Sequence, residues 1–224
     1  MDKIDGILYI NLDYRTDRKK QLLDNLREYN IDFNKIHRIS GILNKECGHL
    51  GCGMSHVKAI KYAISKKWNS VLLLEDDFMF TADIDYINSS LDNIMEDNWD
   101  VLSLYNSNYL YINNDVSPPY KNIKRVARTP GAMAYIMKKH YFERLLECFE
   151  NSVKKMKVQL EKHLEEHTNK LHYVFAIDQA WKSLQRNDIF YIFQPCLGKD
   201  RTKSISDNNM SIAKQRRLIE KLNS

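Results

Sequence analysis

The stretch Val71-Leu72-Leu73-Leu74-Glu75-Asp76-Asp77 places three consecutive carboxylates directly after four consecutive apolar residues. An apolar run without alternation is typical of a strand buried on both faces, as in a mostly parallel sheet flanked by helices. Ligands of open α/β sheets bind at the carboxyl ends of such strands. The stretch therefore predicts an α/β fold with a ligand site at the acidic end of this strand.

The three carboxylates also predict a cation site. Side chains alternate along an extended chain, so Glu75 and Asp77 can converge while Asp76 points elsewhere. Two convergent oxygen donors suit Mn²⁺ or Mg²⁺ carrying a phosphate. The alternative is that these residues only start a turn or cap the next helix. Three adjacent carboxylates repel one another, however, and are easier to explain with a cation among them.

Length and composition indicate a globular chain. It has 224 residues, of which 43% are hydrophobic and 11% aromatic, and this composition excludes a disordered protein. We find no internal repeat and no domain boundary. We therefore expect a single domain over residues 1–224, with a charged helical arm at 151–172 and a C-terminal tail and helix at 196–224.

The sequence shows no targeting segment. It contains no apolar run of about 18 residues and no apolar signal-peptide region near Met1. Its four cysteines form no paired framework of the kind found in secreted proteins. We expect a soluble, cytoplasmic protein with no transmembrane segment and at most peripheral contact with a membrane. The net charge of +5 suits a polyanionic partner or only a solvated surface, and we expect no nucleic-acid partner.

Hydrophobic periodicity predicts alternating strands and helices. The first half has the order β-α-β-α-β, typical of a parallel sheet with crossover helices. The expected strands are 7–10, 35–39, 71–74, 101–105, 132–137, 173–177 and 189–193, and the expected helices include one that starts near Met54, 83–95, 140–149 and 211–222. Residues 109–119 favour an irregular hairpin or flap.

Four stretches in this order resemble glycosyltransferase family 25, the lipooligosaccharide and procollagen galactosyltransferase group. They are YINLDYRTDR at 9–18, GCGMSH at 51–56, LEDD at 74–77 and GAMAY at 131–135, with a weaker fifth, AIDQ at 176–179. The resemblance implies a GT-A fold, a divalent metal held by the acidic motif, and hexose transfer with inversion, in lipopolysaccharide biosynthesis or collagen glycosylation. The chain departs from the pattern in its long charged segment 151–172 and in lacking a C-terminal retention tetrapeptide, which argues against a luminal animal collagen enzyme.

Several residues are expected to bind the sugar-nucleotide donor. The expected donor-site residues are Asn11, Leu12, Arg15, Arg18, Ser55, His56, Lys199 and Arg201. Residues 11–18 would lie where the first strand ends and the next helix begins. Ser55 and His56 would open a helix whose start receives a phosphate or ribose. Lys199 and Arg201 would close over the pyrophosphate. Local first-turn salt bridges and a solvated basic tail are the alternatives.

A zinc site offers another interpretation of the Gly51 region. Cys47, His49, Cys52 and His56 are all potential ligands. Cys-x₄-Cys with interleaved histidines lacks the usual Cys-x₂-Cys spacing, however, so we favour the donor-site interpretation.

Inversion requires a base that takes the proton of the acceptor hydroxyl. Asp178 is our choice because it follows the apolar run 173–177 and opens the next helix. An N-cap role is the alternative, with Asp100 and Asp207 as the next candidates for the base. Among the acidic residues, Glu75 and Asp77 are expected to hold the metal. Asp76 is assigned to the catalytic residues because it would point toward the donor sugar or a neighbouring helix.

The sequence thus predicts a metal-dependent, inverting glycosyltransferase. It would move a hexose, foremost galactose, from a UDP-sugar to a hydroxyl of a saccharide or hydroxylysine acceptor. Two alternatives remain. One is another metal-dependent phosphoryl or nucleotidyl transferase, although no P-loop motif occurs. The other is a non-catalytic basic module that binds nucleic acid or an anionic glycan in a salt-dependent manner.

Overall fold

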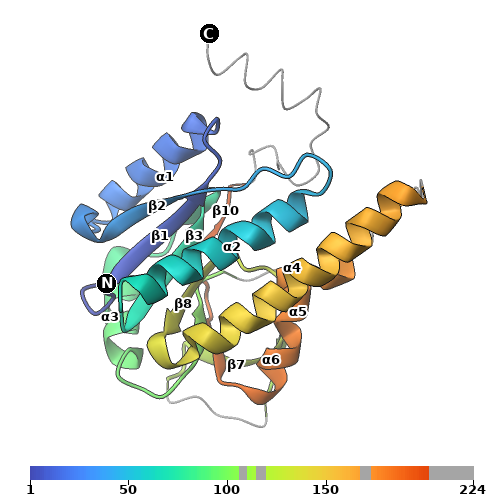
Figure 1. Cartoon of the computed structure of the whole chain (residues 1–224). Coiled ribbons are helices and arrows are strands. Elements are labelled where there is room, and N and C mark those ends of the chain that lie inside the picture. The colour runs from blue at the N-terminus through green and yellow to red at the C-terminus, as the bar shows by residue number, and fades with distance from the viewer. Residues whose placement is uncertain (106–109, 115–119, 167–172, 202–224) are drawn as a thin grey trace.

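The computed structural model describes residues 1–105, 110–114, 120–166 and 173–201, which form a layered α/β fold (Figure 1). The helices are α1 (Thr16–Glu28), α2 (Gly48–Ser65), α3 (Ile84–Ile94), α4 (Phe142–Glu165), α5 (Ile177–Ala180) and α6 (Lys182–Asn187), with 3₁₀ turns η1 (Phe33–Lys35), η2 (Lys139–Tyr141) and η3 (Tyr173–Phe175). The strands are β1 (Gly6–Asn11), β2 (Ile36–Ser40), β3 (Ser70–Glu75), β4 (Phe78–Phe80), β5 (Val101–Ser103), β6 (Tyr111–Ile112), β7 (Ile123–Arg128), β8 (Ala134–Lys138), β9 (Phe190–Phe193) and β10 (Gly198–Asp200).

The main sheet has eight strands in the order β2-β1-β3-β8-β5-β9-β7-β6. β1 pairs in parallel with β2 and β3, and β5 pairs in parallel with β9. β8 runs antiparallel to β3 and β5, and β7 runs antiparallel to β9 and β6. Most of the described strands of this sheet therefore point in one direction, which confirms the expected mixed, mostly parallel sheet flanked by helices. β4 and β10 pair separately in an antiparallel ribbon.

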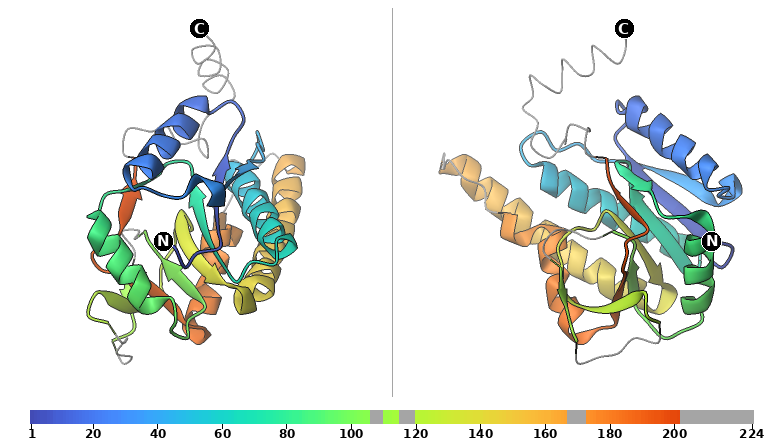
Figure 2. Two further views of the ribbon diagram at one scale, coloured as in Figure 1. Left: turned by 90° about the vertical axis from the view of Figure 1, so that its left-hand side faces the viewer. Right: turned by 180° about the vertical axis from the view of Figure 1, so that it is seen from behind.

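Helices cover both faces of the sheet, with α1 and α3 on one side and α2 and α4 on the other (Figure 2). β3 is buried along its whole apolar run because it packs in both directions. Leu72 and Leu74 contact the α1 and α3 side, while Val71 and Leu73 contact the α2 and α4 side. Complete burial of each such side chain contributes roughly 1.5–3 kcal/mol, which explains why the run shows no alternation of polar and apolar residues.

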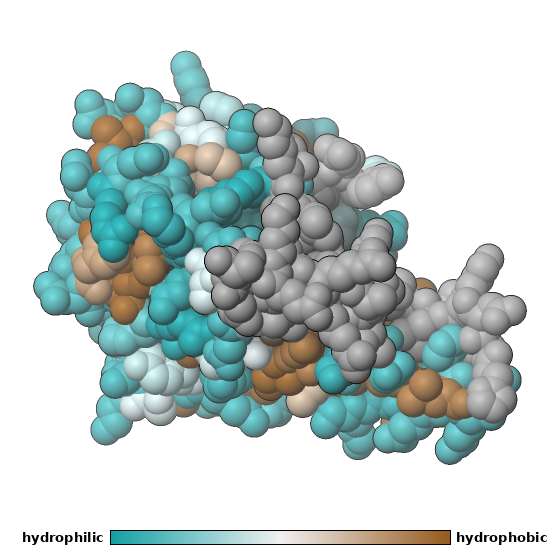
Figure 3. Space-filling view, turned by 90° about the horizontal axis from the view of Figure 1, so that it is seen from above, coloured by the Kyte–Doolittle hydropathy of each residue, from teal (hydrophilic) through white to brown (hydrophobic). Residues whose placement is uncertain are grey.

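The surface contrasts with this interior. The face seen from above in Figure 3 is mostly hydrophilic, with separate hydrophobic areas. Among the described helices, none combines the length and the apolar character needed to span a bilayer. The longest, α4, carries charged residues along much of its length.

The predicted start of the second helix was wrong. α2 begins at Gly48 rather than near Met54, so Gly51 and Gly53 lie inside the helix. A Cβ at position 51 would lie 2.3 Å from the carbonyl oxygen of Ile42, which shows that the loop before α2 crosses this turn of the helix closely. Gly51 therefore permits a close backbone approach and does not interrupt the helix.

One prediction for the C-terminal half was also wrong. Residues 173–177 form no strand, because η3 and α5 occupy this segment and Ala176 and Ile177 pack against helices. Short apolar runs do not distinguish a strand from a buried helical turn. The helix predicted at 140–149 and the first part of the charged arm form one continuous helix, α4. The rest of the arm and the helix predicted at 211–222 lie outside the described residues.

The close approach at Gly51 makes a testable prediction. We expect Gly51→Ala to destabilise the fold by about 1–2 kcal/mol, lowering the melting temperature by roughly 2–8 °C, because the added methyl group would meet backbone atoms. Gly53→Ala is the matched control. It gains the same helix propensity, but its Cβ would meet only methyl groups of Ile177 and Val153 at 3.1 Å. Equal melting temperatures for the two variants would contradict the prediction.

Candidate functional site

The three carboxylates lie at the carboxyl end of β3, where Asp76 and Asp77 form the turn into β4. We call residues 75–77 the acidic turn. Strand alternation directs Glu75 to the α2 face of the sheet, the face shared by Val71 and Leu73. Asp76 has the opposite direction and contacts α1. The acidic turn is therefore held by helices on both faces of the sheet.

Asp76 is buried and fully engaged. Its Oδ2 accepts a hydrogen bond of 2.8 Å from Asn11 Nδ2, and its Oδ1 accepts one of 3.0 Å from an Arg18 terminal nitrogen. The amide of Asn11 is oriented by Arg38, whose Nε donates to Asn11 Oδ1 at 3.1 Å. Burial raises the pKa of Asp76 despite the opposing effect of Arg18 and Asn11. Asn11 and Arg18 thus anchor the acidic turn to β1 and α1.

Asp77 is less well satisfied. Its Oδ2 lies 3.4 Å from the Arg18 guanidinium, but its Oδ1 is buried and finds no hydrogen-bond partner among the described residues. Burial, together with the charges of Glu75 and Asp76, raises the pKa of Asp77 to about 7. The protein therefore stabilises the anions of Glu75 and Asp76 better than the anion of Asp77.

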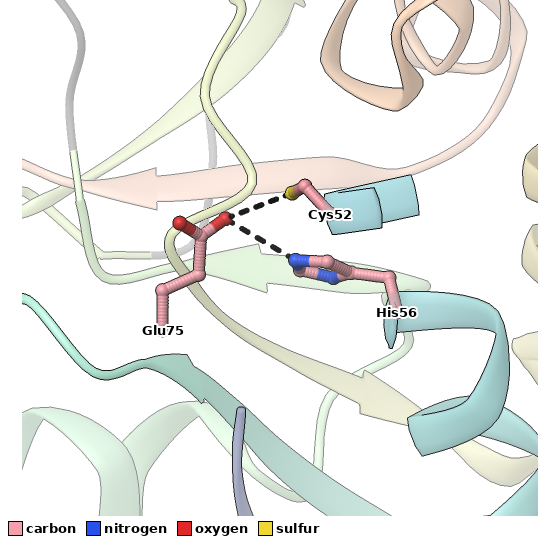
Figure 4. A group of neighbouring side chains, drawn as sticks. All are labelled: Cys52, His56 and Glu75. Atoms are coloured by element: carbon pink, nitrogen blue, oxygen red, sulfur yellow. Dashed lines mark hydrogen bonds and ion pairs between the residues drawn. The ribbon is translucent and has the colours of Figure 1, made fainter. Parts of the chain in front are cut away.

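Glu75 receives its contacts from α2 (Figure 4). Its Oε1 lies 3.2 Å from His56 Nε2 and 3.7 Å from Cys52 Sγ. The other ring nitrogen of His56, Nδ1, lies 3.0 Å from the hydroxyl of Tyr135 on β8. Burial acts to raise the pKa of Glu75, but the hydrogen bonds from His56 and Cys52 and the charge of Arg18 outweigh it, so the pKa lies below its usual value.

Two hollows meet at this site. The first, of about 80 Å³, is lined by the acidic turn and by residues of β1, α1, α2 and the loop before α2, namely Ile10, Leu12, Arg18, Gly41, Ile42, Leu43, Asn44, Gly48, Cys52, Ser55 and His56. The second, of about 280 Å³, is lined by Glu75 with His49, Cys52, Tyr105, Pro130, Gly131, Ala132, Met133, Ala176, Ile177 and Asp178. Cys52 and Glu75 line both hollows, so a group bound in one lies close to a group bound in the other.

Two further expected donor-site residues, Arg15 and Ser55, also have partners within the protein. Arg15 is 2% exposed and forms two hydrogen bonds of 3.0 Å with the carboxylate of Asp17, which is the local salt bridge named as the alternative. Ser55 lies inside α2 rather than at its start, where its Oγ donates to Gly51 O at 2.7 Å and accepts from Ile42 N at 2.8 Å. Ser55 therefore fixes the loop that precedes α2.

The two basic residues of the tail lie beside the acidic turn. β10 pairs with β4, and this pairing places Lys199 opposite Met79. The backbone N–H of Arg201 donates to the carbonyl oxygen of Asp77 at 2.9 Å, and its guanidinium contacts Gln21 Oε1 at 2.5 Å. Lys199 is exposed. The strand β10, which the sequence did not predict, thus places these residues beside the site.

Asp178 lines the second hollow from α5. Ala176, not Asp178, is the N-cap of α5, so the N-cap alternative for Asp178 was wrong. Its Oδ2 accepts from Gly131 N at 3.3 Å. Asp100, a reserve candidate, lies at the amino end of β5, on the opposite edge of the sheet, and bonds to His140 and to Ile189 N. The other reserve candidate, Asp207, lies outside the described residues.

Tyr135 was missing from the predicted residues, while Cys52 and His49 were named from the sequence only as potential zinc ligands. Cys52 and Tyr135 contact the Glu75–His56 pair, and His49 lines the second hollow. Cys52 and His56 are four residues apart and so share one helix face. That spacing would have brought Cys52 to the site if the start of α2 had been placed at Gly48.

Comparison of the sequence with models of known protein families gives a match over the part of the chain that contains the site. The family model described as "Glycosyltransferase family 25 (LPS biosynthesis protein)" matches residues 46–160, just over half of the chain, including α2, β3, the acidic turn and β8. This chain belongs to glycosyltransferase family 25. It is therefore a glycosyltransferase, and the resemblance inferred from the sequence motifs is confirmed. No curated protein matches the chain.

Solved structures show distant similarity to this glycosyltransferase. A197 from STIV is 10% identical, with 91% of this chain and 87% of that chain covered and a TM-score of 0.47. Mannose-1-phosphate geranyltransferase from Thermus thermophilus is 10% identical, with 89% and 74% covered and a TM-score of 0.47. A glycosyltransferase involved in glycosylation of the major capsid of PBCV-1 is 12% identical, with 97% and 98% covered and a TM-score of 0.44. With TM-scores below 0.5, none of these similarities bears on the function of the chain.

The opposite pKa shifts of Asp77 and Glu75 predict opposite effects of neutralising them. The pKa of Asp77 is about 7 in the folded protein and 3.8 in the unfolded chain. Between pH 3.8 and pH 7 the folded state therefore binds more protons than the unfolded state. The free energy of unfolding therefore falls as pH rises through this range. Above pH 7, ionised Asp77 destabilises the folded state to its full extent. Glu75, whose folded pKa is lowered, contributes stability above its usual pKa that is lost as pH falls through the folded pKa.

In metal-free buffer at pH 8, we expect Asp77→Asn to stabilise the fold, on the order of 2–4 kcal/mol, and Glu75→Gln to destabilise it. Both differences should shrink toward pH 4, where the wild-type carboxyls in the unfolded chain become protonated. Thermal unfolding of the wild type and both variants across this pH range measures the effect. A lower melting temperature for Asp77→Asn at pH 8 would contradict the assignment.

Proposed function

We propose that this family 25 chain is a metal-dependent, inverting glycosyltransferase that moves a hexose, foremost galactose, from a UDP-sugar to a saccharide hydroxyl. The observation that carries the proposal is the acidic turn, where Asp77 Oδ1 is buried without a partner in the described part of the chain. The raised pKa of Asp77, about 7, indicates that nearby positive charge would stabilise this carboxylate as an anion. A divalent cation would supply that charge.

The donor atoms fit such an ion. Glu75 and Asp77 offer carboxylate oxygens to the first hollow, and oxygen donors are the preferred ligands of Mg²⁺ and Mn²⁺. When bound, the ion would supply Lewis-acid assistance by offsetting charge on the UDP leaving group. Asp76 is committed to Asn11 and Arg18, so its part is to hold the acidic turn in place.

The first hollow is the proposed entrance for the diphosphate. Arg18 lines it and carries positive charge against the acidic turn, and Arg201 is attached to that turn through the carbonyl of Asp77. Leu12 and Leu43 line the same hollow with apolar side chains. Its volume of about 80 Å³ suits the diphosphate end of the donor, so the nucleoside would extend outward from it.

The second hollow is the proposed acceptor side. Asp178 lines it together with Glu75, which also faces the first hollow. In an inverting transfer, the acceptor oxygen bonds to the anomeric carbon while the bond from that carbon to the phosphate oxygen breaks. Asp178 would take the hydroxyl proton, and UDP would leave with the electron pair. Donor and acceptor would thus approach from opposite sides of Glu75.

Membership of a glycosyltransferase family argues against both alternatives drawn from the sequence. A phosphoryl or nucleotidyl transferase would use the same carboxylates but would release a product other than UDP. A non-catalytic basic module would need neither the ion nor the base.

The donor assignment predicts a joint effect of nucleotide and metal. UDP with Mn²⁺ should stabilise the wild type far more than either alone, by about 2.7 kcal/mol when the ligand is at a hundredfold its Kd. The reason is that the ion would be held partly by Glu75 and Asp77 and partly by the diphosphate. Thermal unfolding with UDP, ADP and GDP, each with Mn²⁺ or EDTA, measures this joint stabilisation.

The control for this experiment is Asp77→Asn, which removes one anionic ligand. It should lose the joint effect of UDP and Mn²⁺, since an amide is a poor ligand for a hard cation. Equal stabilisation by ADP or GDP would refute the uridine assignment. Equal stabilisation in EDTA would refute the metal assignment.

The base assignment predicts the effect of Asp178→Asn. The amide oxygen of asparagine can still accept from Gly131 N, but it cannot take a proton, so kcat should fall about a hundredfold or more. The Kd for UDP-sugar and the melting temperature should stay near those of the wild type. Turnover and thermal unfolding of Asp178→Asn and Asp178→Ala separate the loss of the base from the loss of the hydrogen bond. Normal turnover in Asp178→Asn would show that the base lies elsewhere.

A further inference from the structure

Three side chains of metal-ligating type meet at the junction of the two hollows. The ligand atoms of Cys52, His56 and Glu75 all lie within 4.8 Å of one another (Figure 4). Cys52 and His56 are one helical turn apart on α2, and Glu75 reaches them from the end of β3. The cluster combines a thiol, an imidazole and a carboxylate, so its chemistry differs from that of the oxygen donors proposed for the hard cation.

Two of the three separations between ligand atoms are close to those of ligands around a small ion, and the third is within 4.8 Å. His56 Nε2 and Cys52 Sγ lie 3.2 and 3.7 Å from Glu75 Oε1. An N–H···O hydrogen bond spans about 2.7–3.2 Å, so the first separation also fits the hydrogen bond described above. Tetrahedral zinc, with bonds of about 2.0–2.3 Å, separates a nitrogen and an oxygen ligand by roughly 3.3 Å and a sulfur and an oxygen ligand by roughly 3.5 Å. The same two contacts can therefore be hydrogen bonds in the metal-free protein and ligand separations when an ion is bound.

The surroundings of His56 also fit a metal ligand. The ring is completely buried and stacks on Tyr135 with an interplanar angle of 11°. The Tyr135 hydroxyl lies 3.0 Å from Nδ1, which leaves Nε2 directed at the cluster. Metal-binding histidines usually make such a bond through the second ring nitrogen, and it fixes the orientation of the ring.

The site is also open to solvent-borne ligands. Cys52 and Glu75 line both hollows, so a fourth ligand can enter from either one. Three protein ligands with one open position is the arrangement of reactive zinc sites, whereas structural sites have four protein ligands.

We propose that Cys52, His56 and Glu75 form a binding site for a borderline-soft divalent cation of the Zn²⁺ class. This site is separate from the hard-cation site at Asp77 but shares Glu75 with it. Thiolate and imidazole ligands favour Zn²⁺ and Co²⁺ over Mg²⁺. Binding displaces the thiol proton of Cys52, and the proton passes to solvent. The site follows from its own ligands and does not depend on the transferase chemistry.

The test is a titration of the metal-free full chain with Co²⁺, whose absorption reports coordination. We expect one equivalent to give the visible spectrum of tetrahedral Co²⁺ and a near-ultraviolet band from thiolate-to-cobalt charge transfer. Zn²⁺ should abolish both, while Mg²⁺ in large excess should not. Absence of the charge-transfer band in the wild type would overturn the proposal.

Variants identify the ligands. Cys52→Ser should lose the charge-transfer band, and His56→Gln should weaken Co²⁺ binding at least about tenfold. Cys148→Ser, at another partly buried free cysteine, is the matched control and should leave the spectrum unchanged. A band of wild-type intensity in Cys52→Ser would overturn the proposal.

One variant distinguishes this proposal from the proposed function. Asp77→Asn should keep the Co²⁺ spectrum while losing the stabilisation by UDP with Mn²⁺. If wild-type protein shows the Co²⁺ site but no effect of UDP with Mn²⁺, the donor assignment fails and the soft-cation site stands. If it shows the effect of UDP with Mn²⁺ but no cobalt–thiolate band, the soft-cation site fails alone.

Discussion

The electrostatic repulsion among three adjacent carboxylates at the end of a buried strand constrains much of this structure. Two like charges about 4 Å apart repel by roughly 4 kcal/mol at an effective dielectric constant of 20. The chain disperses the charges by strand alternation, sending Glu75 toward α2 and Asp76 toward α1. Asp77, in the turn, keeps a buried oxygen without a described partner. The remaining electrostatic cost is thus concentrated at Asp77.

This constraint explains why polar residues far apart in sequence gather here. Arg38 orients Asn11, and Asn11 and Arg18 then bind Asp76, so β2, β1 and α1 all contribute to one acidic turn. On the other face, α2 brings His56 to Glu75, and Gly51 in the same helix lets the preceding loop cross it closely. Packing of helices on both faces of the sheet is therefore what makes the site possible.

Local sequence patterns correctly predicted the features that depend on neighbouring residues in the chain, such as the buried strand β3. The unbroken apolar run at 71–74 predicted β3 and its acidic end, because a strand buried on both faces has apolar residues at every position. The role of Gly51 was misjudged because a glycine that interrupts a helix and one that permits a backbone crossing look the same without the partner loop. β10 and the partners of Ser55 were likewise set by long-range contacts. The resemblance, rather than periodicity, carried the functional assignment to the correct family.

Charge balance relates the two proposed cation sites. The acidic turn carries up to three negative charges, Arg18 supplies one positive charge, and one divalent ion supplies two, so a single hard cation neutralises the turn. A second divalent ion, bound with a Cys52 thiolate, would add one net positive charge at the junction of the two hollows. That excess would favour an incoming diphosphate over a neutral ligand. Since Glu75 belongs to both ligand sets, the binding of one ion would affect the binding of the other. Repulsion between the two charges would weaken the binding of each ion without preventing it, and an anionic diphosphate in the first hollow would reduce that repulsion.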